Sequence, residues 1–325
     1  MSTQDAAASE KRSLPLPKPR GRLQLQEYAL VGVVALILIV GAILEPDTFL
    51  TSDNMLNVLR QASVVGVLAI GMTFVIATGG IDLSVGSMVA AAAVAGGQLA
   101  DSGSLAFVLG ALAMGILLGG INAGAIAFGR VVPFIATLAM FTMARGLALW
   151  LSDKTPVSLF SLDGVRWFGN GEVIGIPSAA IVFLAVTAFA WVLLNRTRYG
   201  RYVVATGGNR EAARIAGVKV RWIVFSVYVL SGICVAIAAI LVSGRLASAS
   251  PIIGNLYELD AIAAVVIGGS ALAGGRATIV GTFLGVITFA LIFNLLTLMD
   301  LAVEIQQITK GLIILAAVLI QRRER

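Results

Sequence analysis

The chain has 325 residues, of which 58% are hydrophobic and only 12% charged. A soluble domain is about 45 to 50% apolar and about 25% charged, so the composition excludes an ordinary soluble fold. One helical crossing of a bilayer takes roughly 20 apolar residues. We therefore expect an all-α polytopic membrane protein, with no room for a separate soluble domain. The formal net charge of +6 comes from basic residues scattered between apolar runs, which does not favour a nucleic-acid partner.

The chain contains no histidine and one cysteine, Cys234. Without histidine there are no imidazole metal ligands and no histidine-activated nucleophile. An intrachain disulfide is excluded because it needs two cysteines. We therefore expect no catalytic residue, no metal site and no cofactor in this chain, and a membrane enzyme is the least favoured class of protein.

Ten apolar runs follow a basic, proline-broken stretch, residues 1–24, which we expect to be a disordered cytoplasmic arm. The runs lie at 28–44, 62–78, 83–100, 105–128, 134–151, 178–194, 222–243, 261–273, 279–298 and 308–320. We expect about ten transmembrane helices in one permease-sized domain, 25–321, followed by a basic tail, 322–325. Several runs are short, and 261–273 is re-entrant in an alternative with eight or nine crossings.

Lysine and arginine mark the connections that stay on the cytoplasmic side of a membrane. Most of the 23 basic residues fall in alternate connections, at 1–24, Arg130, 195–221, Arg276 and 322–325. The other connections hold most of the acidic residues, and we place Glu258 and Asp260 among them. This asymmetry predicts that both termini and the 195–221 loop are cytoplasmic.

The chain contains 36 glycines, and several stand four residues apart inside the apolar runs. These pairs are Gly115 and Gly119, Gly120 and Gly124, and Gly281 and Gly285. Small residues at this spacing let helix backbones approach each other in lipid. The pattern predicts a closely packed helix bundle.

Two glycine pairs interrupt the apolar pattern. Gly79-Gly80 is followed by Asp82 and Ser84, and an acid at membrane depth needs a reason. Either Asp82 caps the next helix, or the segment is a polar break that lines a solute path. Gly274-Gly275 repeats the same spacing to a later glycine, which suggests an internal duplication.

Three further polar residues lie at the depth of the apolar runs: Asn122, Arg145 and Asn294. Polar side chains inside a membrane often line the path of a transported solute. They also form hydrogen bonds between neighbouring helices, which is the commoner case. The sequence leaves both interpretations open.

The 195–221 loop contains the pattern of a short capped helix. Gly207-Gly208 precedes Asn209, a good N-cap residue, and Glu211 suits the positive end of a helix. Ala212 and Ala213 continue the helix, and Gly217 can adopt the left-handed conformation that ends it. Such a short helix needs a surface to pack on, either the protein's own cytosolic face, the lipid headgroups or a partner subunit. The chain has no phosphate-binding loop, so ATP-driven transport requires another polypeptide to bind ATP.

Three segments resemble the ribose-type permeases of bacterial sugar ABC importers: 71–87, 200–213 and 257–269. The similarity runs from about residue 46 to 321. It implies a multi-pass inner-membrane subunit that pairs with a second permease copy, receives a pentose or similar monosaccharide from a periplasmic binding protein, and is driven by a cytosolic ATPase subunit. The coupling segment of that family falls on Glu211-Ala212-Ala213 and Gly217. Two departures are the lack of Ile-x-Leu-Pro after Gly217 and the presence of Ala277 where relatives commonly have glycine.

A second class of function remains open from the residues themselves. A stand-alone secondary transporter would use an ion gradient, with Asp82 as the coupling acid. The scarcity of other intramembrane acids argues against it, because Asp82 has no clear second partner in the sequence.

Overall fold

The computed structural model describes residues 21–323, and the side chains of residues 28–319. The described chain is helical almost throughout. The long helices are α1 (Gly21–Leu44), α2 (Ser52–Ala77), α4 (Ser104–Ala127), α5 (Pro133–Leu151), α7 (Ser178–Arg196), α10 (Val220–Leu246), α12 (Ile279–Leu298) and α13 (Val303–Arg323). The shorter ones are α3 (Val85–Gly97), η1 (Ala100–Ser102), α6 (Asp163–Asn170), α8 (Arg198–Gly208), α9 (Arg210–Ile215) and α11 (Tyr257–Ile267).

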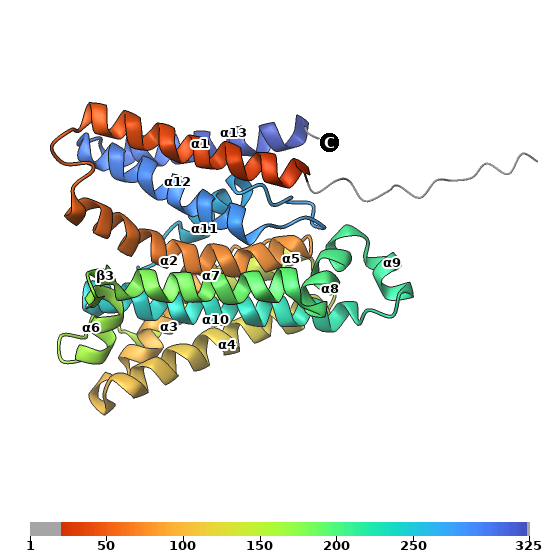
Figure 1. The fold of residues 1–325 in the computed structure, drawn as a ribbon. Coiled ribbons are helices and arrows are strands. Elements are labelled where there is room, and N and C mark those ends of the chain that lie inside the picture. Colours follow the sequence, from red (N-terminus) through yellow and green to blue (C-terminus); the bar gives the residue numbers. More distant parts are fainter. Residues whose placement is uncertain (1–20, 324–325) are drawn as a thin grey trace, which may run out of the picture.

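Four two-residue strands form two small antiparallel ribbons. β1 (Val157–Ser158) pairs with β4 (Ser248–Ala249), and β2 (Glu172–Val173) pairs with β3 (Ile176–Pro177). Both ribbons and α6 lie at one end of the helix bundle, which we call the strand end (Figure 1). They form part of the connections that follow α5 and α10 on that side.

Helices α8 and α9 lie at the opposite end of the bundle, which we call the α9 end (Figure 1). The start of α1 and the end of α13 are at this end too, as the sequence predicts for both termini and the 195–221 loop. The orientation of this end toward the cytoplasm remains a prediction. Helix α1 begins at Gly21, and the rest of the expected arm, 1–20, lies outside the described residues.

Each of the ten apolar runs forms a helix, but their lengths differ. Within residues 28–319, six helices are long and apolar enough to cross a membrane by themselves: α2, α4, α5, α7, α10 and α12. Helix α3 has 13 residues and α11 has 11, which correspond to about 20 Å and about 16 Å. A hydrocarbon core of about 30 Å is longer than either. Ten full crossings therefore stay a prediction, and α3 and α11 are half-length helices.

The most closely packed glycines bring α4 and α10 together. A Cβ atom on Gly119 would lie 2.8 Å from the carbonyl oxygen of Tyr228, and Gly115 has Gly232 directly opposite it. The packing predicted from the glycine spacing is therefore confirmed at these two positions. Gly120 and Gly124 have no other atom of the described chain within reach of a Cβ, so close packing at this pair stays a prediction.

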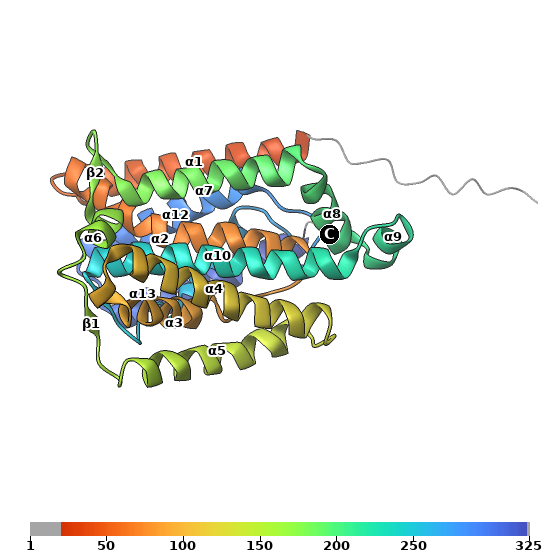
Figure 2. The same ribbon diagram turned by 90° about the horizontal axis from the view of Figure 1, so that it is seen from below.

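Helix α2 lies at the centre of the bundle and contacts α7, α10, α11 and α12 (Figure 2). Its second half is buried without interruption from Gly66 to Ala77. Next to it, Gly281 and Gly285 of α12 face the backbone of α11, which confirms the third predicted glycine pair. The second half of α2 is buried on all sides, which explains why its sequence is continuously apolar and not amphipathic.

Candidate functional site

Helix α9 has the two caps that its sequence predicts. The side-chain oxygen of Asn209 accepts a hydrogen bond from the backbone N–H of Ala212 at 2.9 Å. At the other end Gly217 has a φ of +84°, and its N–H donates to the carbonyl of Arg214 at 3.0 Å. Only a residue that tolerates the left-handed conformation fits there without strain.

One face of α9 is anchored and the other is open. Ala213 is buried, whereas Glu211, Arg214 and Ile215 are exposed, and Ile215 keeps 76% of its surface accessible. Glu211 and Arg214 form an ion pair one turn apart. The hydrogen bond and the charge of Arg214 lower the pKa of Glu211. The helix therefore presents a preformed polar surface with one protruding apolar side chain.

Helix α8 is not predicted by the sequence pattern, from which 195–208 was expected to form part of a loop. Thr197 caps this helix by accepting a hydrogen bond from the N–H of Gly200 at 3.3 Å. Its buried face is formed by Gly200, Val203 and Thr206, at helical spacing. That spacing was the available signal. Gly207 and Gly208 are consequently the last residues of a helix and not part of a flexible turn.

Glycines from three pairs that are distant in sequence meet at the α9 end. The N–H of Gly275 donates to the carbonyl of Ala77 at 3.0 Å. A Cβ on Gly207 would overlap that same carbonyl, and a Cβ on Gly274 would lie 2.7 Å from the backbone nitrogen of Gly79. We call this contact of Gly79, Gly207, Gly274 and Gly275 the glycine junction. The two breaks that match in sequence thus touch in space, while an internal duplication remains a prediction.

Arg210, the first residue of α9, adds a side-chain link to the junction. Its guanidinium donates to the carbonyl of Thr78 at 3.4 Å. Thr78 directly follows the last residue of α2 and begins the break that contains Gly79 and Gly80. Helix α9 is therefore connected through backbone and side-chain contacts to the end of α2 and to the break.

The break leads into a buried polar cluster around Asp82. One carboxylate oxygen accepts the N–H of Ser84 at 3.0 Å and its hydroxyl at 2.6 Å, and the other accepts the hydroxyl of Ser231 on α10 at 3.2 Å. Asn122 on α4 donates to the Ser84 hydroxyl at 2.9 Å. Asp82 therefore organises the start of α3, close to the predicted capping role, although Ser84 occupies the N-cap position.

The N-terminal ends of α3 and α11 meet inside the bundle. Gly86 lies against the backbone of Gly254 and the carboxylate of Glu258, where any side chain would overlap both. Arg145 of α5 holds the turn before α11 by donating to the carbonyls of Pro251 and Ile253, the latter at 3.1 Å. Two half-length helices thus begin inside the bundle, next to a turn that Arg145 holds.

The prediction that Glu258 and Asp260 lie in an outer connection is wrong. Both are buried, because α11 begins at Tyr257, four residues before its apolar run. Asp260 forms an ion pair with Lys310 of α13. A lysine inside the last apolar run was the signal that an acid must lie opposite it, since an unpaired charge at membrane depth is costly.

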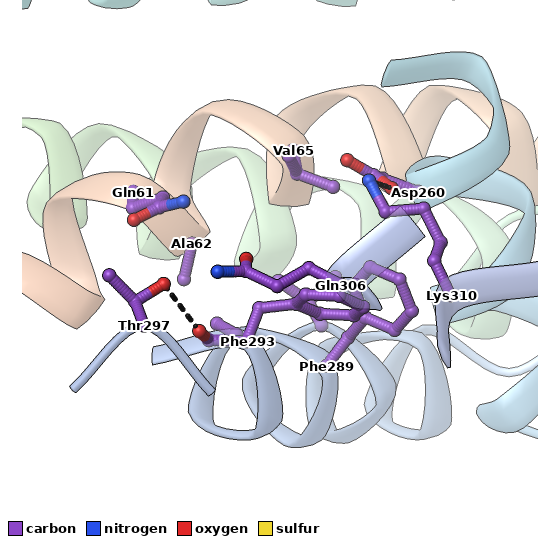
Figure 3. A pocket seen from close by; sticks show the side chains of 11 residues that line it. Gln61, Ala62, Val65, Asp260, Phe289, Phe293, Thr297, Gln306 and Lys310 are labelled. Atoms are coloured by element: carbon purple, nitrogen blue, oxygen red, sulfur yellow. Dashed lines mark hydrogen bonds and ion pairs between the residues drawn. The ribbon is translucent and has the colours of Figure 1, made fainter. Parts of the chain in front are cut away.

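A cavity of about 160 Å³ lies beside this ion pair (Figure 3). Helices α2, α11, α12 and α13 contribute its walls. The lining residues are Gln61, Ala62, Val65, Asp260, Val286, Phe289, Ala290, Phe293, Thr297, Gln306 and Lys310. A water molecule needs far less room, so the space suits a small solute.

None of the three polar residues singled out at span depth lines this cavity. Asn294 pairs with Asn54 through two hydrogen bonds of 2.7 and 2.9 Å between α12 and α2. Asn122 belongs to the Asp82 cluster, and Arg145 holds the turn before α11. All three residues form hydrogen bonds to other parts of the bundle, as the commoner of the two interpretations expects. Their role as residues that line the solute path stays a prediction.

Apolar helices of spanning length, a cluster of helix breaks and a cavity with polar and apolar walls are typical of a multi-pass membrane transport protein. Residues 54–318 match the family described as branched-chain amino acid transport system / permease component. The chain belongs to this permease family, and it is a multi-pass protein of the inner membrane.

Its relatives carry more specific names. The chain is 41% identical over 304 residues to the ribose import permease protein RbsC of Haemophilus influenzae, covering 92% of this chain and 94% of that one. It is 44% identical over 298 residues to RbsC of Bacillus subtilis, covering 90% and 92%. Identity to the D-allose transport system permease protein AlsC of Escherichia coli is 34% over 299 residues, covering 91% of each chain. No solved structure matches the chain.

Proposed function

We propose that the chain is the transmembrane permease subunit of an ATP-driven ABC importer for a monosaccharide. The solute is a pentose such as ribose, or a related sugar or polyol, and it passes to the cytoplasm by alternating access. The relatives that are named for ribose and D-allose transport support a sugar as the solute. The chain has no phosphate-binding loop, so a separate cytosolic subunit binds and hydrolyses ATP.

The observation that carries this proposal is the link between α9 and the glycine junction. Helix α9 is too short to be stable alone, yet it is capped at both ends and held through Ala213. Such a preformed surface loses little freedom when a partner binds. The partner is the ATPase subunit, which contacts the exposed face formed by Glu211, Ala212 and Ile215.

Movement of α9 reaches the membrane-buried part of the chain through the junction. Gly207, Ala77 and Gly275 touch backbone to backbone, so no flexible side chain absorbs a displacement between them. A shift of α8 and α9 therefore moves the end of α2 and the break that leads to Asp82. Closely packed interfaces of this kind respond as a switch rather than by gradual deformation.

Two further partners complete the importer. A periplasmic sugar-binding protein delivers the solute to the strand end, which is the end opposite α9. A second permease copy, identical or related, packs beside the first within the lipid bilayer. The family resemblance supports both partners, and the opposite placement of the two ends supports delivery of the solute at the strand end.

Gly217→Pro is expected to abolish sugar uptake and the stimulation of ATP hydrolysis, while the protein stays folded in the membrane. Proline cannot adopt the positive φ of Gly217 and lacks the N–H that donates to Arg214. Glu211→Lys should have the same effect, because it reverses a charge on the docking face. Uptake of labelled sugar and ATPase activity of the assembled transporter measure both.

Gly217→Asn is the matched control, since asparagine tolerates the left-handed conformation and keeps the N–H. It should retain uptake. Normal uptake in Gly217→Pro and Glu211→Lys would refute the docking role of α9.

A further inference from the structure

The cavity beside Asp260 and Lys310 lies in the half of the bundle away from α9. Its α2 wall begins at Gln61, in the first half of that helix, and its α13 wall is formed by Gln306 and Lys310, within the first eight residues of α13. Both helices start at the strand end (Figure 1). In the orientation proposed above, the cavity therefore lies on the side from which the solute arrives.

Two of the residues that line the cavity are charged, Asp260 and Lys310, and their opposite charges leave the lining with no net charge. Asp260 and Lys310 pair with each other, and their side chains are 12% and 17% exposed. A buried ion pair is costly when one partner is missing, so an ion entering the site would have to compete with the existing partner. A neutral solute keeps the pair intact. The ammonium group has three donors and the carboxylate several acceptor positions, so the pair can also bind hydroxyl groups.

One wall of the cavity is aromatic. The rings of Phe289 and Phe293 lie with their centroids 4.6 Å apart, and the Lys310 ammonium stands 5.3 Å from the centre of the Phe293 ring. Figure 3 shows the side chain of Gln306 beside these rings, and Gln61 lies near Ala62 at another part of the wall. The site thus combines a flat apolar surface with donors and acceptors at its edge, which is the usual composition of a small-molecule pocket.

Among small solutes, neutral sugars and polyols match this combination. A sugar ring carries hydroxyl groups at its edge and C–H groups on its faces, so it can pack on Phe293 while it bonds to the amides and the ion pair. A lipid tail offers no partner for Asp260, Lys310 or the amides, and polar groups that lose water without a new partner are penalised.

We propose that this cavity is a binding site, inside a single subunit, for one neutral polyhydroxylated solute of monosaccharide size. The proposal rests on the proposed function as a sugar permease. It adds that the subunit itself recognises the solute, through the aromatic wall and the Asp260–Lys310 pair, in the half of the membrane that faces the binding protein.

Cysteine protection tests the site directly, because the single native cysteine, Cys234, is buried. Thr297 lines the cavity and is exposed, so Thr297→Cys should react with a maleimide. The purified full-length variant is labelled with and without D-ribose, D-allose, D-galactose or D-fructose. At least one of these sugars should slow labelling five-fold or more, and ribose 5-phosphate should not. Ser161→Cys, an exposed position outside the cavity, should label at an unchanged rate.

Gln306→Leu and Phe293→Ala, each combined with Thr297→Cys, should raise the sugar concentration needed for half-protection by ten-fold or more. Leu312→Ala, on an exposed part of α13, should not change it. Gln306→Leu keeps the size of the side chain, so it tests the site even if Phe293→Ala fails to fold. The proposal is overturned if a sugar that the assembled transporter imports gives no protection, or if Gln306→Leu is protected at the wild-type concentration. Failure of the assembled transporter to import any sugar would instead refute the proposed function.

Discussion

Gly207→Ala is expected to reduce sugar uptake to near background, whereas Gly208→Ala, one residue later, should leave uptake within about two-fold of wild type. A Cβ on Gly207 would overlap the carbonyl of Ala77 and lie 2.6 Å from the backbone nitrogen of Gly275. Neither is the end of a flexible side chain, so the backbone itself has to shift. Overpacking of this kind costs typically about 1–3 kcal/mol, and here it separates α8 from the end of α2.

Gly208→Ala provides a close control because both residues end the same helix. Its Cβ would lie 3.8 Å from the Cα atom of Gly275, an ordinary van der Waals distance. Uptake in cells and the melting temperature of the purified protein should be measured for both variants. Equal effects of the two substitutions would contradict the role of the glycine junction in transmitting movement from α9.

Asp82 separates the two functional hypotheses. Asp82→Asn should retain uptake, because an asparagine oxygen can still accept both hydrogen bonds from Ser84 while its amide group faces the Ser231 hydroxyl. Asp82→Ala should lower both the melting temperature and uptake. It leaves buried polar groups at the start of α3 without their acceptor, at a cost of about 1–3 kcal/mol for each group left unpaired.

A stand-alone transporter that uses Asp82 as its coupling acid makes the opposite prediction. Asparagine carries no titratable proton, so Asp82→Asn would abolish uptake as completely as Asp82→Ala. The purified chain would also transport sugar into liposomes under a proton or sodium gradient without any ATPase. Two measurements therefore distinguish the ATP-driven importer from the ion-coupled transporter: sugar uptake by the two Asp82 variants, and sugar transport by the purified chain in liposomes under a proton or sodium gradient.

Local signals in the sequence predicted local structure well. Each apolar run forms a helix, and the caps of α9 at Asn209 and Gly217 form as expected, because capping depends on residues within one turn. The break after Ala77 also follows from its own residues, since Gly79 takes a positive φ of 77°. The glycine spacing predicted close packing for Gly115 with Gly119 and for Gly281 with Gly285, but it does not say which helix lies opposite: Gly120 and Gly124, at the same spacing, meet no other helix of the described chain.

Contacts between distant segments were less predictable. Nothing at Ala77 or Gly79 states that Gly207 lies against the first and Gly274 against the second, since these contacts depend on how distant segments pack. The depth of Glu258 and Asp260 was misjudged because polar residues at the start of an apolar run fit both a loop and the first turn of a helix. Only the partner, Lys310, which is 50 positions further along the chain, distinguishes these cases.

Half-length helices explain a further difference. The apolar runs 83–100 and 261–273 predict short crossings. The helices formed there extend over 85–97 and 257–267, so the first is shorter than its run and the second begins and ends earlier. Gly268-Gly269 ends α11 early, and Asp82 with Ser84 fixes the start of α3. Asp82 and Ser84 lie at the start of an apolar run and Gly268-Gly269 lies inside one, and in both cases these residues set a helix boundary that hydropathy alone does not detect.

Purification of the tagged chain from its native membranes will show whether α9 docks an ATPase. We expect an ABC ATPase subunit to co-purify in stoichiometric amount, Gly217→Pro to remove it and Gly217→Asn to retain it. Recovery of the wild-type chain without an ATPase, from membranes that import the sugar, would refute the ATP-driven importer.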